Sequence, residues 1–563
     1  MRRLKPFTFM LAAALFFING AVVSAAPDDG AKPADPLVAA RAAANGDPLL
    51  DAMLTELARS KAELKMNGAE APYYIEYRAS DLEDISQEAA FGAMRQDDHV
   101  RIRLLRVVVR VGDYRQDSYF GGAMGETTLL PLDNDSIALR HQIWLATDNA
   151  YKAALEAYTQ KQSILKQFSA DEKPVDDFAK APVAAVVEPV TKLSVDDAAW
   201  RKQLLDVTSL YREYPDIQSV TASARFTATN EYFVNSEGTV TRTGKTVYSV
   251  QLTASTQAAD GMRLSRSPGW TVGRVEELPS GEKLMADSKE TLESLVALRK
   301  APIVEEEYRG PVLFDADAAN DVVATLIGAN VLGFKPQLGR PNRTVGGFAT
   351  SYKQRVLPTF LSVVDDPTLK EFAGKSLIGS YNVDSEGVKA QAVDLIDKGM
   401  LQNYLLGRAP IRDFTTSNGH GRATPSGSPS PNLGVLLLKS SEPQTPDALK
   451  QRMLQMAKDG DRPFVYHVVT LGPGNTPRLL YRVYAKDGHE ELVRGAVFNE
   501  LDLRSLRGDI TAAGNDSLVS NRQAGASTTI ISPSILFDEL EVRRANQSKD
   551  KLPEYPAPPI SNK

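Results

Sequence analysis

The five histidines of the chain form no local metal motif, because they are far apart in the sequence. A helical zinc motif places two histidines within about one or two turns, so that both reach one ion. His489-Glu490 begins like H-E-x-x-H, but Val493 occupies the position of the second histidine. The others are His99, His141, His420 and His467. The sequence has no cysteine, which excludes disulfides, a thiol nucleophile and cysteine-ligated zinc.

One further motif-like stretch fails on its spacing. Gly244-Lys245-Thr246 resembles the end of a phosphate-binding loop, but five residues separate Gly238 from Gly244 where the motif has four. The sequence also has no G-x-S-x-G nucleophile elbow. It therefore favours neither a nucleotide site nor a serine hydrolase.

Asp384 and Glu386 are two residues apart and would share one face of a strand. Such a carboxylate pair can bind a metal or transfer protons. Gly387 follows directly, however, and Asp and Gly are typical of turns. The stronger interpretation is a solvated turn.

The densest polar cluster is the stretch from Ser417 to Arg422. Its glycines, Gly419 among them, would let backbone amides approach a ligand closely. His420 and Arg422 could orient a carboxylate or a peptide carbonyl. We therefore take Asn418, Gly419, His420 and Arg422 as candidates for binding a peptide or a partner. If they do bind, replacing His420 and Arg422 with Ala should weaken binding and leave the thermal midpoint nearly unchanged. The alternative, weighed equally, is a mobile surface loop.

The chain length and the pattern of apolar residues predict the elements that position these residues. They indicate an α+β protein of several domains. A single core rarely exceeds roughly 250–300 residues, and this chain has 563. Apolar residues recur at helical spacing near residues 50–64, 137–167, 200–211 and 284–298, and alternate over 217–252. From residue 380 onward, strands and turns dominate. The fold class is a mixed α/β N-terminal half followed by a β-rich C-terminal domain.

Changes in composition divide the chain into six segments. They are a signal peptide at 1–25, a mobile leader at 26–45, an N-terminal α+β region at 46–135, a central region at 136–305 with a linker at 169–196, a β-rich C-terminal domain at 306–545, and a polar tail at 546–563.

The N-terminus has the three parts of a bacterial signal peptide. Positive charges at residues 2, 3 and 5 precede an apolar stretch at 9–18 and the small-residue site Val23-Ser24-Ala25. A retained anchor would need about 20 apolar residues. We expect a periplasmic or secreted protein with no membrane span after cleavage. The net charge of -6 argues against a nucleic-acid partner.

The second half of the chain resembles the TldD/PmbA family of metallopeptidase-related proteins. The resemblance rests on the order and spacing of Gly310-Pro311-Val312-Leu313-Phe314, Asp384-Ser385-Glu386-Gly387-Val388, Asp397-Lys398-Gly399-Met400-Leu401 and Tyr404-Leu405-Leu406. It covers roughly residues 310–542 and is weaker over the first 300. It implies an α+β N-terminal region, a central region and a β-rich C-terminal domain.

This resemblance also implies what kind of subunit the chain is. The TldD kind carries H-E-x-x-x-H on the helix that opens the C-terminal domain and a later cysteine, and these bind zinc. The PmbA kind lacks them and pairs with an active partner. In this sequence the motif positions fall on Ala324, Thr325 and Ala329. The resemblance therefore implies no metal cofactor and no catalytic residue. Familiar members are cytoplasmic, and the export signal departs from that pattern.

Three functions are compatible with these observations. The favoured one is a non-catalytic subunit of a metallopeptidase-type complex acting on peptides, in a hetero-oligomer with an active homologue or as a homodimer. The second is an active metallopeptidase with scattered ligands such as His420, His467, Asp384 or Glu386. The third is a stand-alone binding protein of the cell envelope.

Overall fold

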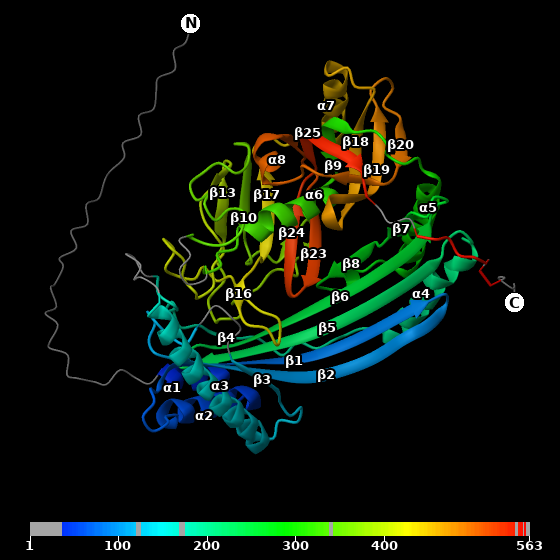
Figure 1. Ribbon diagram of the computed structural model, residues 1–563. Coiled ribbons are helices and arrows are strands. Elements are labelled where there is room, and N and C mark those ends of the chain that lie inside the picture. The colour runs from blue at the N-terminus through cyan, green and yellow to red at the C-terminus, as the bar shows by residue number, and fades with distance from the viewer. Residues whose placement is uncertain are drawn as a thin grey trace, which may run out of the picture.

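A long curved sheet forms the base of the molecule, and the C-terminal domain lies on its concave side (Figure 1). The computed structural model describes residues 36–119, 125–167, 175–336, 342–546, 550–555 and 557–558. The sheet has the order β3-β2-β1-β5-β6-β4, with β7 and β8 also paired to β6. Its strands are β1 (Pro72–Ala90), β2 (Ala93–Val111), β3 (Glu126–Leu129), β4 (Ala185–Val187), β5 (Ser219–Asn235), β6 (Val240–Gln257), β7 (Arg263–Arg266) and β8 (Gly269–Val272).

Period-two alternation gives this sheet one apolar face and one polar face, since successive side chains of a strand point to opposite sides. The even-numbered residues of β5, such as Phe226 and Val234, are buried in two hydrophobic clusters. The odd-numbered residues of β5, such as Thr229 and Glu231, face the C-terminal domain. The hairpin between β5 and β6 is closed by Asn235, whose Oδ1 accepts hydrogen bonds from the amides of Glu237 and Thr239.

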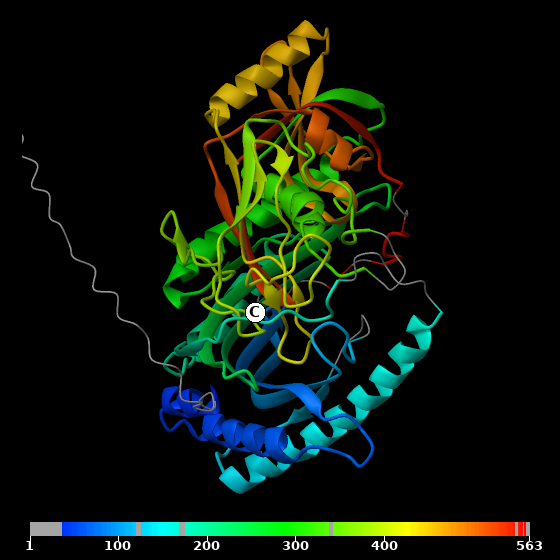
Figure 2. The same ribbon diagram turned by 90° about the vertical axis from the view of Figure 1, so that its left-hand side faces the viewer.

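Helices cover the apolar face of the sheet. One hydrophobic cluster joins α1, α2 and α3 to one end of the sheet, and another joins α4 and α5 to the other end. Figure 2 shows α1, α2 and α3 at the opposite end of the molecule from α7. The helix bounds are α1 (Pro36–Ala44), α2 (Pro48–Glu63), α3 (Ser136–Leu165), α4 (Asp197–Thr208), η1 (Ser209–Arg212), η2 (Val275–Glu277) and α5 (Gly281–Lys300). Aspartate side chains cap α2, α3 and α4 by accepting backbone hydrogen bonds in the first turn.

The C-terminal domain contains two larger sheets. One has the order β20-β19-β18-β9-β25-β21 with β22 beside β25, and the other has the order β14-β13-β10-β17-β24-β23. The strands are β9 (Tyr308–Phe314), β10 (Leu361–Asp365), β11 (Glu371–Phe372), β12 (Lys375–Ser376), β13 (Val393–Asp397), β14 (Met400–Leu401), β15 (Gly421–Arg422), β16 (Ser430–Pro431), β17 (Val435–Ser440), β18 (Phe464–Gly472), β19 (Thr476–Tyr484), β20 (Glu490–Val493), β21 (Ala496–Phe498), β22 (Ile510–Ala513), β23 (Leu518–Ala524), β24 (Ala526–Ser532) and β25 (Ile535–Arg544).

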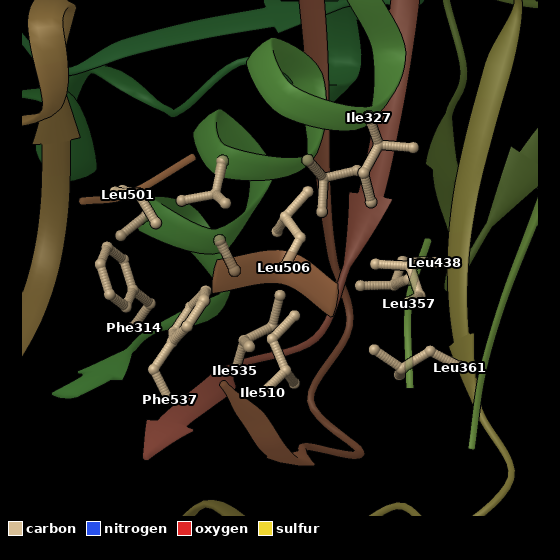
Figure 3. Packing of buried hydrophobic residues seen from close by; sticks show 14 of the residues in the cluster. Phe314, Ile327, Leu357, Leu361, Leu438, Leu501, Leu506, Ile510, Ile535 and Phe537 are labelled. Carbon is tan, nitrogen blue, oxygen red and sulfur yellow. The ribbon is translucent and has the colours of Figure 1, made fainter. Parts of the chain in front are cut away.

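The largest hydrophobic cluster lies between these two sheets. Phe314 and Phe537 from the first sheet and Leu361 and Leu438 from the second pack around Ile327 of the intervening helix (Figure 3). The helical segments of this domain are α6 (Ala316–Val322), η3 (Val323–Ile327), η4 (Gly328–Asn330), α7 (Pro446–Asp459), η5 (Pro473–Asn475) and α8 (Leu503–Gly508). The α+β class and the β-rich C-terminal domain expected from the sequence are therefore confirmed.

Several segment assignments differ from those expected. Residues 36–44, assigned to a mobile leader, form α1 with Leu37, Ala40 and Ala44 buried, so that assignment is wrong there. Strands on both sides of the expected boundary at 135/136 pair in one sheet, because β1 and β5 are neighbours. Part of the expected linker at 169–196 is also built into the fold, since β4 pairs with β6. The signal peptide and residues 26–35 lie outside the described residues.

The helices of the described ranges include none that is both long and apolar enough to cross a membrane.

Candidate functional site

A cavity of about 740 Å³ lies between the polar face of the long sheet and the C-terminal domain. Strands β1, β5 and β6 form its floor. Its roof comes from three segments of the C-terminal domain, around residues 376–385, 422–425 and 523–527. Its size falls within the range of about 300–1,000 Å³ that is typical of ligand sites. Because it is lined from both parts of the fold, it is the candidate functional site.

The strand register places the floor residues in rows across the sheet. Leu82, Thr229 and Lys245 lie opposite one another on β1, β5 and β6. Thr243 lies on the same side of β6 as Lys245, since residues two apart point the same way. Threonine is common in strands, and here its side chains also give the floor a hydroxyl-rich surface.

Lys245, on the floor of the cavity, is a partly buried basic side chain. Its side chain is partly buried and, within the described residues, has neither a hydrogen-bond acceptor nor an ion-pair partner. Burial, followed by the repulsion of nearby Arg422, holds the pKa of Lys245 well below its ordinary value. Burial raises the pKa of Glu231, against the opposing influences of Arg78 and of a hydrogen bond from Ser80.

Asp384 and Glu386 lie in a turn, as expected, but the turn is buried rather than solvated. Asp384 Oδ1 accepts hydrogen bonds from the amides of Glu386 and Val388, and Asp384 Oδ2 accepts one from Gly421 at 2.8 Å. Burial, followed by the charge of Glu386, raises the pKa of Asp384 to about 8. Asp384 also lines the cavity. The interpretation as a solvated turn is therefore wrong.

The stretch from Ser417 to Arg422 is not an exposed loop either. His420 is fully buried; its Nε2 lies 3.3 Å from Asp365 Oδ1, and its Nδ1 lies 3.0 Å from the carbonyl of Asn418. Asn418 holds the loop in place through the backbone of Tyr404 and Leu406. The interpretation as a surface loop is therefore wrong, and because His420 and Arg422 are buried we now expect their substitution to lower stability.

The backbone geometry at position 419 requires glycine. Its φ is +76°, and a Cβ there would lie 2.4 Å from the carbonyl oxygen of Lys389. Of the four candidates from this stretch, Arg422 alone lines the cavity. Its guanidinium lies 4.5 Å from the ring centroid of Tyr381 and donates to the carbonyl of Ser527. The structure thus brings Arg422 to the site and gives Asn418, Gly419 and His420 supporting positions.

Arg408, to which the sequence analysis gave no role, connects the C-terminal domain to the long sheet. Its fully buried side chain donates to Glu237 Oε1 at 2.8 Å and to the carbonyl of Ala179 at 2.9 Å. Its guanidinium also lies 4.0 Å from the ring centroid of Phe178. These three contacts, to residues distant in the sequence, therefore hold the C-terminal domain against the long sheet. No local sequence motif could have revealed them.

The helix that matches the family zinc motif is distorted and carries no ligand side chains. Its η3 stretch is π-helical, and the amide of Gly328 reaches back to the carbonyls of Val323 and Ala324. Ala324 is partly buried, whereas Thr325 and Ala329 are exposed. Thr325 Oγ1 donates to the carbonyl of Asp321. Methyl and hydroxyl groups at these positions do not fit a zinc ion, which needs imidazole, thiolate or carboxylate ligands.

The scattered ligands considered for an active hydrolase have separate partners. His467 lies on β18, with its Nε2 2.7 Å from Asp315 Oδ1, while His420 contacts Asp365. Over the described ranges, no three or more His, Asp or Glu side chains group together as a metal site would require.

Comparison with known proteins identifies the architecture. TldE from Thermococcus kodakarensis has a TM-score of 0.59 at 13% identity, with 87% of this chain and 100% of that chain covered. A Thermotoga maritima protein described as a proposed modulator of a DNA gyrase has a TM-score of 0.55 at 16% identity, covering 87% and 99%. A Bacteroides thetaiotaomicron protein described in the same way has a TM-score of 0.56 at 14% identity, covering 88% and 98%. These likenesses establish the fold.

The family follows from the C-terminal domain. Residues 307–544 match the family model described as the PmbA/TldA metallopeptidase C-terminal domain. Residues 307–544 are therefore a domain of the metallopeptidase-related TldD/PmbA family. None of the curated proteins matches the chain.

Proposed function

We propose that this chain is an exported TldD/PmbA-type protein that binds peptides in the cavity without cleaving them on its own. The observation that carries the proposal is the cavity itself, which is lined by both the sheet and the C-terminal domain. Its hydroxyls, charges and backbone groups can pair with the amides and carbonyls of an extended peptide.

The residues at the zinc-motif positions do not support catalysis by this chain alone. A zinc peptidase needs about three protein ligands and a position for water. The matching helix supplies Ala324, Thr325 and Ala329, and the sequence has no cysteine. Such a chain fits a subunit that supports an active homologue in a hetero-oligomer, as the PmbA kind does. Co-purification from its native envelope distinguishes this assembly from a homodimer.

Export is the second part of the proposal. The charged start, the apolar stretch and Val23-Ser24-Ala25 support cleavage before Ala26. N-terminal sequencing of protein from the cell envelope is expected to begin near Ala26. A chain that still begins with Met1 would contradict export with cleavage.

The experiment for peptide binding is a substitution that fills the cavity. Thr229→Trp places a large ring on the floor, and Ser223→Trp places the same ring on the same strand and face but outside the cavity lining. We expect Thr229→Trp to weaken the binding of a labelled peptide mixture at least about tenfold. Ser223→Trp should bind like the wild type. Equal binding by all three proteins, with unchanged thermal midpoints, would contradict peptide binding in this cavity.

A further inference from the structure

The cavity contains cations that no carboxylate neutralises. Arg78, Lys245 and Arg422 line it, and within the described residues none of the three forms an ion pair. Arg422 and Arg78 donate to backbone carbonyls, whereas the ammonium of Lys245 has no acceptor among the described residues. An unpaired donor in a partly buried position costs free energy, so an acceptor from outside the chain would stabilise Lys245.

The acidic residues of the cavity do not supply that acceptor. Glu188 accepts hydrogen bonds from Asn382 and from the amide of Gly244. Glu231 accepts a hydrogen bond from Ser80, and Asp384 accepts three from backbone amides. These carboxyls therefore have partners within the chain, and among the described residues none forms an ion pair with Lys245.

Two free hydroxyls stand beside the unpaired ammonium. Thr229 lies opposite Lys245 in the register, and Thr243 precedes it by two residues on the same strand face. Neither hydroxyl has a hydrogen-bond partner among the described residues, and both line the cavity. Arg422 lines the same cavity from the roof, and its charge contributes to the lowered pKa of Lys245.

From this juxtaposition we infer that the cavity selects peptides carrying a carboxylate, which binds between Lys245 and Arg422 with the hydroxyls of Thr229 and Thr243 beside it. A carboxylate has two acceptor oxygens, which can take one charged donor and the neighbouring hydroxyls together. It also relieves the repulsion between the two cations. The inference rests on the proposed peptide binding and adds the chemical class of the ligand.

A peptide carboxylate can come from the C-terminus or from an Asp or Glu side chain, and three fluorescent peptides distinguish the two. The first is an apolar peptide with a free C-terminus, the second is its C-terminal amide, and the third is the amide with one central Glu. We expect the amide to bind at least about tenfold more weakly than whichever carboxylate peptide fits. Equal binding by all three peptides would overturn the inference while leaving peptide binding intact. Binding by none would contradict both.

Variants of Lys245 link any preference to this site. Lys245→Met is expected to abolish the preference for the carboxylate, and Lys245→Arg is expected to retain most of it. The control is Lys375→Met, because Lys375 is an exposed lysine of the C-terminal domain that does not line the cavity. A preference that survives Lys245→Met, or is lost equally in Lys375→Met, would overturn the inference.

Discussion

Arg408 and Glu237 form a 2.8 Å ion pair between the C-terminal domain and the hairpin of the long sheet. Glu237 also accepts a hydrogen bond from Tyr114, so the pair belongs to a network that reaches the segment following β2. The cavity depends on this network, because its floor and roof come from the two parts that the pair connects.

The first prediction concerns this pair. Arg408→Met leaves Glu237 without its cation and removes a fully buried side chain. Breaking a buried pair in this way costs about 3–5 kcal/mol of unfolding free energy. The control is Lys202→Met, which removes an exposed pair with Asp206 and should cost about 0–1 kcal/mol. Chemical denaturation measures both, and equal losses would contradict the role of Arg408.

The second prediction concerns His420. His420→Ala removes the side chain that contacts Asp365 and leaves a buried carboxylate short of a partner. We expect a loss of about 1–3 kcal/mol. His489→Ala is the control, because His489 is exposed and should change stability by no more than about 0.5 kcal/mol. A thermal midpoint unchanged by His420→Ala would show that the loop does not support the fold.

The third prediction is a pH dependence. The pKa of Asp384 rises from its ordinary value of 3.8 to about 8 on folding. Between these values the folded state holds a proton that the unfolded state releases, so this group lowers stability as pH rises through the window. The buried Glu386, whose pKa is also raised, acts in the same direction.

Asp384→Asn removes this titration and should flatten the decline of unfolding free energy between about pH 4 and pH 8. The variant also loses the acceptor for Gly421, so its stability should be lower at acidic pH. Asp397→Asn, at an exposed carboxyl, should keep the slope of the wild type. A slope unchanged by Asp384→Asn would show that Asp384 is ionised throughout this range.

The fourth prediction concerns the distorted helix. The π-helical stretch ends at Ile327, and the zinc-motif positions Ala324, Thr325 and Ala329 carry no ligand side chain. Zinc sites take about three or four protein ligands, so the wild-type protein loaded with zinc should lose the metal on gel filtration in metal-free buffer. Elemental analysis of the eluted protein measures the zinc content. Stoichiometric zinc in the wild-type protein would support the active-hydrolase alternative instead.

The local elements and the family could be predicted from the sequence, but most of the site could not. Alternation over 217–252 predicted strands, and this range forms most of β5 and β6. The pairing of β1 with β5 was not predicted, because the two strands are separated in the sequence by α3 and the linker. For the same reason Lys245 appeared only in a failed phosphate motif, although folding places Arg422 near it.

The other wrong predictions concern polar side chains that were expected to be exposed and are buried. Polar runs such as the one from Ser417 to Arg422 are typical of exposed loops, yet His420 is fully buried because Asp365 and Asn418 satisfy its ring nitrogens. Composition does not reveal partners that lie some 50 residues away in the sequence.

The proposed binding of peptides without cleavage is tested by incubating the mature protein with a defined peptide mixture and added zinc, isolating the complex, and identifying the peptides by mass spectrometry. We expect intact peptides bound to the wild type and at least about tenfold less peptide bound to the cavity-filling variant Thr229→Trp. Shortened peptides that appear with the wild type and disappear on chelation would contradict it.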